Sequence, residues 1–310
     1  MVRLLCVLAA CLLFLAPARA ERLDEVPRTA IMSAFAPELV GLLAATRDKR
    51  MVSVHGVDFT LGLLAGRPVV LVLSGVSMVN AAMTTQMLLD RFQVDALLFS
   101  GIAGGLDAGL HIGDVAVPRR WGQFLESHFV RQDADGTLRP VPWASLPFPA
   151  HGAIQPSNAY VRVPGRTEPL RKFWFEADAA LMDLAGKVVP GVKLDRCAAN
   201  KTCLDTTPRA LVGGDGVSGP AFVDNEGWRA YLNGTIGAQV VDMESAAVAL
   251  VAEQNGIPFI AFRSVSDLAG ADPDENRMHI FMALAASNAA RVLMAFLAAM
   301  PPALSPPPVP

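Results

Sequence analysis

The sequence predicts a single α/β domain with a central mixed, largely parallel sheet flanked by helices. Two continuous apolar runs, at residues 69–73 and 96–99, have the composition of strands buried on both faces. Residues 77–92 between them show helical periodicity, and strand, helix, strand in this order predicts a parallel pair. The chain has 310 residues and is 52% hydrophobic, enough for one large core. We therefore expect one domain over residues 21–300.

The amino terminus has the pattern of a secretory leader. A positive residue precedes an apolar run over residues 4–16, and an Ala-Arg-Ala site follows at 18–20, which predicts a signal peptide over residues 1–20. The run is shorter than the roughly 20 residues that span a bilayer, so no stable membrane span is expected. Lipidation at Cys11 is the alternative, but the apolar run continues beyond it. We expect an exported protein, periplasmic or secreted.

Composition argues against several classes of partner. With 26 basic and 29 acidic residues and no basic block, the chain is not expected to bind nucleic acid. The histidines lack metal-ligand spacing, so neither a metal site nor a cofactor is predicted. Two cysteines leave with the leader, and the remaining pair, Cys197 and Cys203, predicts a local disulfide in an oxidising compartment. Two free thiols are the alternative.

The amino-terminal half offers two segments where chemistry is expected. Apolar residues at helical spacing over 39–43 predict a helix, with Glu38 near its start. The strand at 96–99 leads into a glycine-rich segment at 100–105, which we expect to be a loop. Ligands of open α/β sheets bind at the carboxyl ends of strands, so this loop is a candidate binding segment. A tight turn without a ligand is the alternative.

The carboxyl-terminal half returns to regular patterns after a long irregular stretch. Residues 119–235 show no clean period and are expected to be excursions of the same domain. A helix is then predicted over 243–254, capped by Asp242, followed by a strand at 257–262 and an amphipathic helix at 276–299. The proline-rich residues 301–310 are expected to form a disordered tail.

Motifs in both halves resemble those of the methylthioadenosine/S-adenosylhomocysteine nucleosidases, members of the purine and uridine phosphorylase superfamily. Val-Val-Asp-Met-Glu-Ser-Ala-Ala stands at 240–247, and Phe-Arg-Ser-Val-Ser-Asp at 262–267. Gly-Ile-Ala-Gly-Gly-Leu at 101–106 and Ser-Gly-Pro-Ala-Phe-Val at 218–223 extend the resemblance over most of the mature chain. It implies a nucleoside phosphorylase-like fold, a purine nucleoside as small-molecule substrate, and a homo-oligomer, usually a dimer.

The resemblance also implies two catalytic carboxylates. Asp267, oriented by Ser266, would protonate the purine at N7, and Glu38 would position the attacking water. This chemistry suits an N-glycosidic bond, because a neutral purine leaves readily only when it is protonated as the sugar becomes oxocarbenium-like. Burial would raise the pKa of Asp267 enough to keep its proton. Ala36 and Pro37 replace acidic residues that relatives carry before this glutamate.

The same resemblance assigns the substrate contacts. Glu244 and the backbone of Met243 would hold the ribose hydroxyls. Phe222 would stack on the base, and Val223 would present backbone groups to it. Each acid also has a structural alternative, as a partner of a helix dipole or as a cap. The remaining expected contacts are two small residues of the glycine-rich segment and one residue of the last helix: Ala103, Gly104 and Met278.

Three functions follow as alternatives, and hydrolysis is favoured. A phosphorylase needs arginines aimed at phosphate, yet none precedes the glycine-rich segment or accompanies Glu38 closely. Arg47, Arg50 and Arg263 remain, and Arg263 also belongs to the nucleosidase pattern. A non-catalytic nucleoside-binding or storage protein, like the plant bark storage proteins, is the third reading, since Ile102 replaces a small polar residue. Retention of all three acids favours catalysis.

Overall fold

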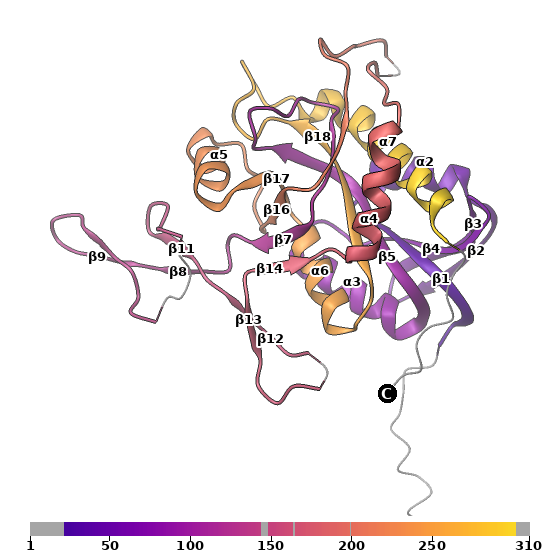
Figure 1. The fold of residues 1–310 in the computed structure, drawn as a ribbon, viewed down its shortest axis with the longest axis horizontal. Coiled ribbons are helices and arrows are strands. Elements are labelled where there is room, and N and C mark those ends of the chain that lie inside the picture. The colour runs from indigo at the N-terminus through magenta and orange to yellow at the C-terminus, as the bar shows by residue number, and fades with distance from the viewer. Residues whose placement is uncertain (1–21, 144–147, 164, 199, 302–310) are drawn as a thin grey trace, which may run out of the picture.

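The computed structural model describes residues 22–143, 148–163, 165–198 and 200–301. The predicted leader lies outside the described residues, as does all but the first residue of the predicted tail. In the described residues, helices cover both faces of a large mixed sheet (Figure 1), and this confirms the predicted fold class.

Four strands form the parallel centre of the sheet. They are β1 (Asp24–Ser33), β4 (Arg67–Leu73), β5 (Phe92–Gly105) and β18 (Phe259–Asp267). β1 lies between β4 and β5, and β18 pairs in parallel with β5. Every residue of β18 is buried, as expected for a strand covered on both faces. The carboxyl ends of these strands meet at one edge of the sheet.

The remaining strands extend the sheet on both sides of this centre. An antiparallel pair, β2 (Arg47–Val54) and β3 (Val57–Leu64), continues it beyond β4. On the other side, β17 (Ala238–Asp242) runs antiparallel to β5. The other members of the sheet are β16 (Asp215–Ser218), β7 (Arg120–Gln123), β14 (Trp174–Glu176), β6 (Val115–Val117) and β15 (Ala210–Val212).

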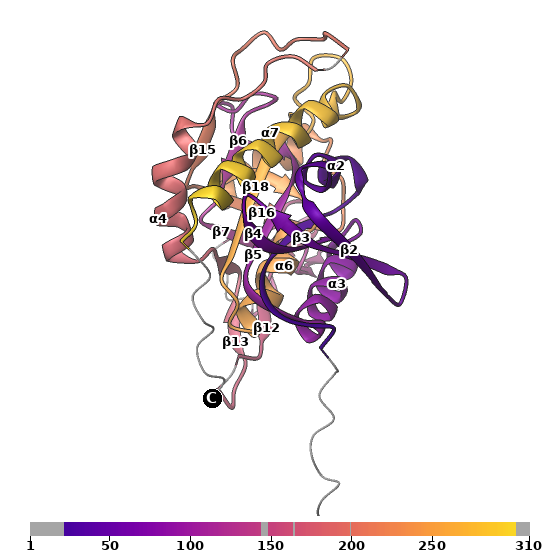
Figure 2. The same ribbon diagram turned by 90° about the vertical axis from the view of Figure 1, so that its right-hand side faces the viewer.

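Helices form one layer on each face of the sheet. On one face, α7 (Met278–Ala299) crosses the sheet between α4 (Ala179–Val188) and α2 (Ala36–Ala45) (Figure 2). The other face carries α3 (Met78–Arg91) and α6 (Ser245–Gln254). By length and composition α7 would also pass as a membrane span, but 61% of its most apolar stretch is buried inside the domain, as in a core helix.

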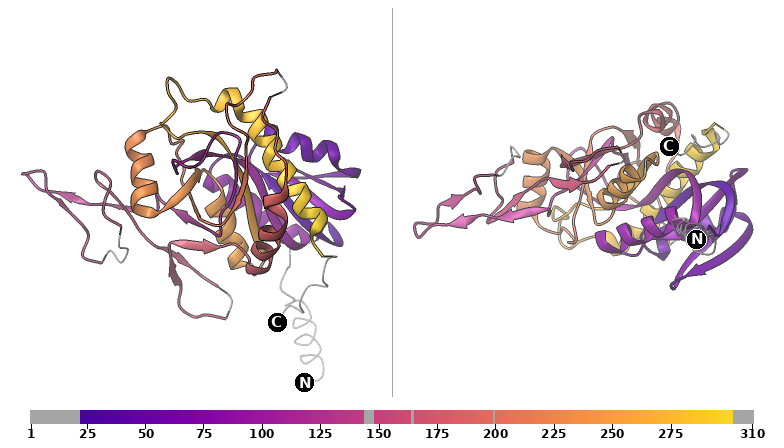
Figure 3. Two further views of the ribbon diagram at one scale, coloured as in Figure 1. Left: turned by 45° about the horizontal axis from the view of Figure 1, so that its top comes forward. Right: turned by 90° about the horizontal axis from the view of Figure 1, so that it is seen from below.

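Only part of the irregular middle region forms excursions, because β7, β14, α4, β15 and β16 in that stretch belong to the body of the domain. Three hairpins project from it (Figures 1 and 3). A shorter helix, α5 (Glu226–Tyr231), precedes the π-helical turn η2 (Leu232–Ile236), and the 3-10 turn η1 (Val189–Gly191) follows α4. The hairpins pair β8 (Ser127–Phe129) with β11 (Ile154–Pro156), β9 (Arg131–Gln132) with β10 (Leu138–Arg139), and β12 (Ala159–Val161) with β13 (Leu170–Lys172).

The predicted disulfide is present between Cys197 and Cys203, in the connection from α4 to β15. The two half-cystines are also joined by an isolated β-bridge. The bond therefore closes a short local loop and links no distant parts of the chain.

Two local expectations were wrong, and the first strand of the sheet was not predicted. The segment at 100–105 is not a loop, because β18 pairs alongside it and keeps it extended to the end of β5. Strand β1 was missed, because its apolar part is short and runs directly into the helical pattern of α2. Asp242 is not the residue directly before α6. It ends β17, and its Oδ1 accepts the backbone N–H groups of Glu244 and Ser245 at 3.2 and 3.1 Å.

Candidate active site

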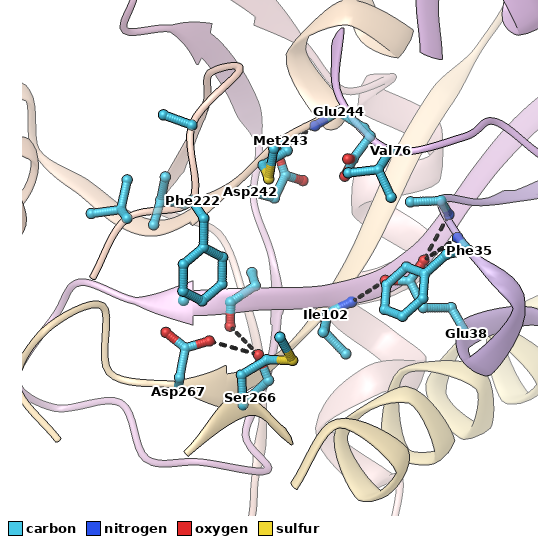
Figure 4. A pocket seen from close by; sticks show the side chains of 17 residues that line it. Phe35, Glu38, Val76, Ile102, Phe222, Asp242, Met243, Glu244, Ser266 and Asp267 are labelled. Carbon is cyan, nitrogen blue, oxygen red and sulfur yellow. Dashed lines mark hydrogen bonds between the residues drawn. The ribbon is translucent and has the colours of Figure 1, made fainter. Parts of the chain in front are cut away.

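A cavity of about 280 Å³ opens at the edge where the parallel strands end. Small-molecule sites typically span roughly 300–1,000 Å³, so it suits a compact ligand. Figure 4 shows its lining. All the predicted catalytic and substrate-binding residues line it: Asp267, Glu38, Glu244, Met243, Ser266, Phe222, Val223, Ala103, Gly104 and Met278. The sequence did not single out Ala34, Phe35, Val76, Ala221 or Val241, which complete the wall together with Ile102 and Asp242.

Glu38 is held by backbone groups from two strand ends. It lies in the first turn of α2 and is 2% exposed. Its Oε2 accepts the N–H of Ala34 at 2.6 Å, and its Oε1 accepts the N–H of Ile102 at 2.8 Å. Both oxygens therefore act as acceptors, which an ionised carboxylate satisfies. Burial raises the pKa of Glu38, while Arg263 and these backbone N–H groups oppose the rise.

One buried arginine serves three carboxylates of the site. The Arg263 side chain is fully buried, and its Nε lies 2.8 Å from Asp242 Oδ2. Its Nη1 lies 3.7 Å from Glu38 Oε1, and its Nη2 lies 3.5 Å from Glu244 Oε2. Gly101 makes this approach possible, because a side chain there would collide with both Arg263 and Glu38. The cluster carries more negative than positive charge.

Asp267 lies across the cavity from Glu38 (Figure 4). It is 1% exposed at the end of β18, and its Oδ2 is 2.8 Å from the hydroxyl of Ser266. Its Oδ1 accepts the N–H of Ala269 at 3.0 Å. Burial raises the pKa of Asp267, against the opposing effect of these hydrogen bonds. This is the environment that the proposed acid requires.

Glu244 lies where α6 begins, facing the start of α3. Its Oε1 accepts the backbone N–H of Ser77 at 2.8 Å. Burial raises the pKa of Glu244 to about 7, and the nearby Asp242 adds to the rise. Phe222 is 53% exposed at the cavity wall, so part of its ring is accessible to a ligand.

The cavity lining contains no lysine, arginine or histidine, although it contains four acidic residues. None of the three arginines considered as candidate phosphate ligands lines the cavity. Arg47 and Arg50 belong to β2 at the far edge of the sheet, and Arg50 lies 3.9 Å from Asp24. Arg263 is fully buried behind the lining, beside three carboxylates. No cluster of His, Cys, Asp and Glu among the described residues has the arrangement of a metal site.

Sequence reasoning missed several groups that hold the acids in place. The backbone donors of Ser77 and Ile102 carry no sequence signal, because any residue supplies an N–H. The role of Arg263 as a shared partner depends on how three separate strand and helix ends meet. Asn276 donates to Asp267 at 3.3 Å, and the sequence indicated only that a helix starts near it.

Known proteins similar to this chain include nucleosidases and a plant storage protein. The 5'-methylthioadenosine/S-adenosylhomocysteine nucleosidase of Mycobacterium bovis is 30% identical over 86% of this chain and 95% of the relative. Bark storage protein B of Populus deltoides is 26% identical over 84% of this chain and 83% of the relative. A crystal structure of S-adenosylhomocysteine nucleosidase from Streptococcus pyogenes in complex with 5-methylthiotubericidin has a TM-score of 0.65 at 25% identity, covering 90% of this chain and 99% of that one. The family model of the phosphorylase superfamily matches residues 28–298, and the chain belongs to that superfamily.

Proposed function

We propose that the protein is a purine nucleosidase, an N-glycosidase that releases the base of a purine nucleoside by hydrolysis. Its substrate class is that of its relatives, the 5'-methylthioadenosine/S-adenosylhomocysteine nucleosidases. Cleavage of this bond needs an acid at the base and a water at the sugar. The observation that carries the proposal is the pair Asp267 and Glu38 on opposite sides of one acidic, cation-free cavity.

The reaction follows from the environment of each acid. Asp267 donates its proton to N7 of the base as the C1′–N9 bond breaks, and the bonding electrons leave with the base. Water adds to C1′ of the sugar, and Glu38 accepts the proton that this water loses. Glu38 then returns a proton to solvent, and Asp267 regains one, so the enzyme is restored. Phe222 stacks on the leaving base, and Val223 presents backbone groups to it.

The carboxylates on the sugar side stabilise the positive charge that develops there. Glu244, with the backbone of Met243, accepts hydrogen bonds from the ribose hydroxyls. Asp242, Glu244 and Glu38 share the single cation of Arg263, so the cluster remains net negative. A negative field stabilises an oxocarbenium-like sugar and repels phosphate. This charge balance supports water rather than phosphate as the acceptor.

Export and self-association complete the proposal. The disulfide between Cys197 and Cys203 supports passage into an oxidising compartment. On α3, Val79 is 80% and Met83 is 55% exposed, and both follow Val76 of the cavity wall. Contiguous exposed apolar side chains mark interaction surfaces. They support a dimer with an interface close to the cavity.

The test is release of free base from 5'-methylthioadenosine, S-adenosylhomocysteine, adenosine and inosine, with and without phosphate. We expect release at the same rate in both conditions, with the unphosphorylated sugar as the second product. A requirement for phosphate, with a sugar 1-phosphate as product, would show that the reaction is phosphorolysis and not hydrolysis. Binding that raises the melting temperature without any cleavage would support a storage or binding role.

A further inference from the structure

We infer that Asn276, in the loop before α7, is a positioning residue that fixes which oxygen of Asp267 carries the acid proton. The inference rests on the proposed role of Asp267 as the acid. Asn276 lies outside the cavity lining and acts through the carboxyl group that it contacts.

The orientation of the Asn276 amide is set by its own hydrogen bonds. Its Oδ1 accepts the backbone N–H of Met278 at 3.0 Å. Its Nδ2 must therefore face the other way, where it lies 3.3 Å from Asp267 Oδ1 and 3.2 Å from Asp224 Oδ1. An amide nitrogen only donates, so both carboxylate oxygens are acceptors in these contacts.

The two oxygens of the Asp267 carboxyl group have different hydrogen-bond donors. Oδ1 receives two N–H groups, from Ala269 and Asn276. A proton on Oδ1 would take an acceptor position that these donors occupy and displace one of the two bonds, so the acid proton resides on Oδ2. There the Ser266 hydroxyl lies 2.8 Å away, and it has a second partner in the carbonyl of Ala103 at 3.4 Å. The hydroxyl turns to Ala103 while Oδ2 is protonated and donates to Oδ2 after the proton has left.

Asn276 also connects the acid to the segment that bears Phe222. Asp224 follows that residue by two positions, so the amide bridges the acid and the base-stacking segment. The backbone reinforces the bridge, because Asn225 N–H donates to the carbonyl of Ala269 at 3.3 Å. Gly270, at φ +98°, lies so close to Asn225 that a side chain there would collide with its backbone. These contacts fix Asp267 and the segment proposed to stack on the base relative to each other.

The charged groups that surround Asp267 make the loss of Asn276 measurable. They include several carboxylates: Asp272 from the same loop, Asp224 from the segment before α5, and Asp242 and Glu244 across the cavity, where Arg263 already serves them. The Arg229 guanidinium of α5 is bonded to the carbonyl of Gly105 at 3.2 Å. Directly before α7, the Arg277 guanidinium lies over the Phe281 ring, 4.9 Å from its centre. Without the amide donor, ionised Asp267 has fewer partners among like charges, so its pKa rises.

The experiment compares Asn276→Ala and Asn276→Asp with wild type, using Asn255→Ala as a matched control. Asn255 ends α6 and bonds Gln86 and the Val251 carbonyl instead. The first readout is NMR titration of the carbon-13-labelled Asp267 carboxyl group, assigned by its loss in Asp267→Asn. The second is the pH profile of base release. Melting curves establish that each variant is folded.

We expect the Asp267 titration to move up by about one pH unit in Asn276→Ala and further in Asn276→Asp. The fall of activity at high pH should move by the same amount, with the maximal rate at least about tenfold lower. Asn255→Ala should change neither. Unchanged titration in both Asn276 variants would overturn the inference. If wild type releases no base while the titration still moves, the proposed function fails and the placement of Asn276 stands.

Discussion

The guanidinium of Arg263 contacts the carboxylate of Glu38 inside the protein, with Nη1 3.7 Å from Oε1 and both side chains almost fully buried. The same guanidinium also serves Asp242 and Glu244. One cation cannot neutralise three carboxylates, so this side of the cavity, where the proposed reaction places the sugar, keeps negative charge. The first three predictions below concern this group of side chains.

Glu38→Gln should remove the group that accepts the proton of the water. We expect base release to fall by about 10²- to 10⁴-fold, the usual contribution of a general base. Nucleoside binding should persist, because the proposed role of Glu38 is to contact the water, although the amide loses one of the two backbone N–H bonds. Steady-state kinetics and a binding titration would measure this split. Glu25→Gln, at an exposed carboxylate, is the control. Full activity of Glu38→Gln would remove Glu38 from the mechanism.

Gly101→Ala should disrupt the contact between Arg263 and Glu38. The added methyl would collide with the buried side chains of both residues. Overpacking of this kind costs about 1–3 kcal/mol, and displacement of Glu38 should lower activity at least about tenfold. Gly41→Ala is the matched control, because nothing lies within 4 Å of the added atom. Because Gly41 lies within α2, its replacement by alanine should instead raise the free energy of unfolding by about 0.5–1 kcal/mol. Chemical denaturation of both variants distinguishes these outcomes.

Glu244→Gln should lower activity and raise stability, and the gain in stability should depend on pH. Burial raises the pKa of Glu244 from its usual 4.5 to about 7, so the folded protein keeps a proton that the unfolded chain loses in that window. The stability present at low pH is therefore lost as pH rises through it. Above about pH 7 the glutamine variant should be more stable by about 1–3 kcal/mol. Melting temperatures across this range measure the difference, and identical pH slopes would contradict it.

Replacing both Cys197 and Cys203 by serine should lower stability without changing catalysis. They are separated by 6 residues in sequence, and closing such a short loop contributes about 2 kcal/mol in the chain-entropy description. Neither residue lines the cavity. Thermal unfolding should show a melting temperature lower by a few degrees, at about 2–4 °C, with unchanged base release. A large loss of activity would show that this loop supports the site.

The sequence alone predicted three of the four central parallel strands, because the buried parts of β4, β5 and β18 contain continuous apolar runs, whereas β1 was missed. Helices α3 and α7 were equally visible from their periodicity. Segment 100–105 was misjudged because glycine signals a turn in isolation. In the folded chain the same glycines allow β5 to pass close beside buried side chains, as at Gly101 against Arg263. Local pattern could not reveal that tertiary requirement.

The site was predictable to a similar depth. Motif resemblance named the residues expected to act as acids and to contact the substrate, and all of them line one cavity. The groups that tune the acids were not predictable, because they are backbone N–H donors or side chains whose partners lie far away in sequence. Asn276 is an example, since its contact with Asp224 spans 52 residues. Such contacts depend on how loops meet after folding.

The most direct test of the central claim compares two substrates with Asp267→Asn. A purine nucleoside needs a proton on its base to leave, whereas a para-nitrophenyl riboside releases a stable phenolate without one. We expect the variant to lose about 10²- to 10⁴-fold of its rate on 5'-methylthioadenosine and to keep most of its rate on the nitrophenyl riboside. Equal losses on both substrates, or no loss on the nucleoside, would contradict the assignment of Asp267 as the acid.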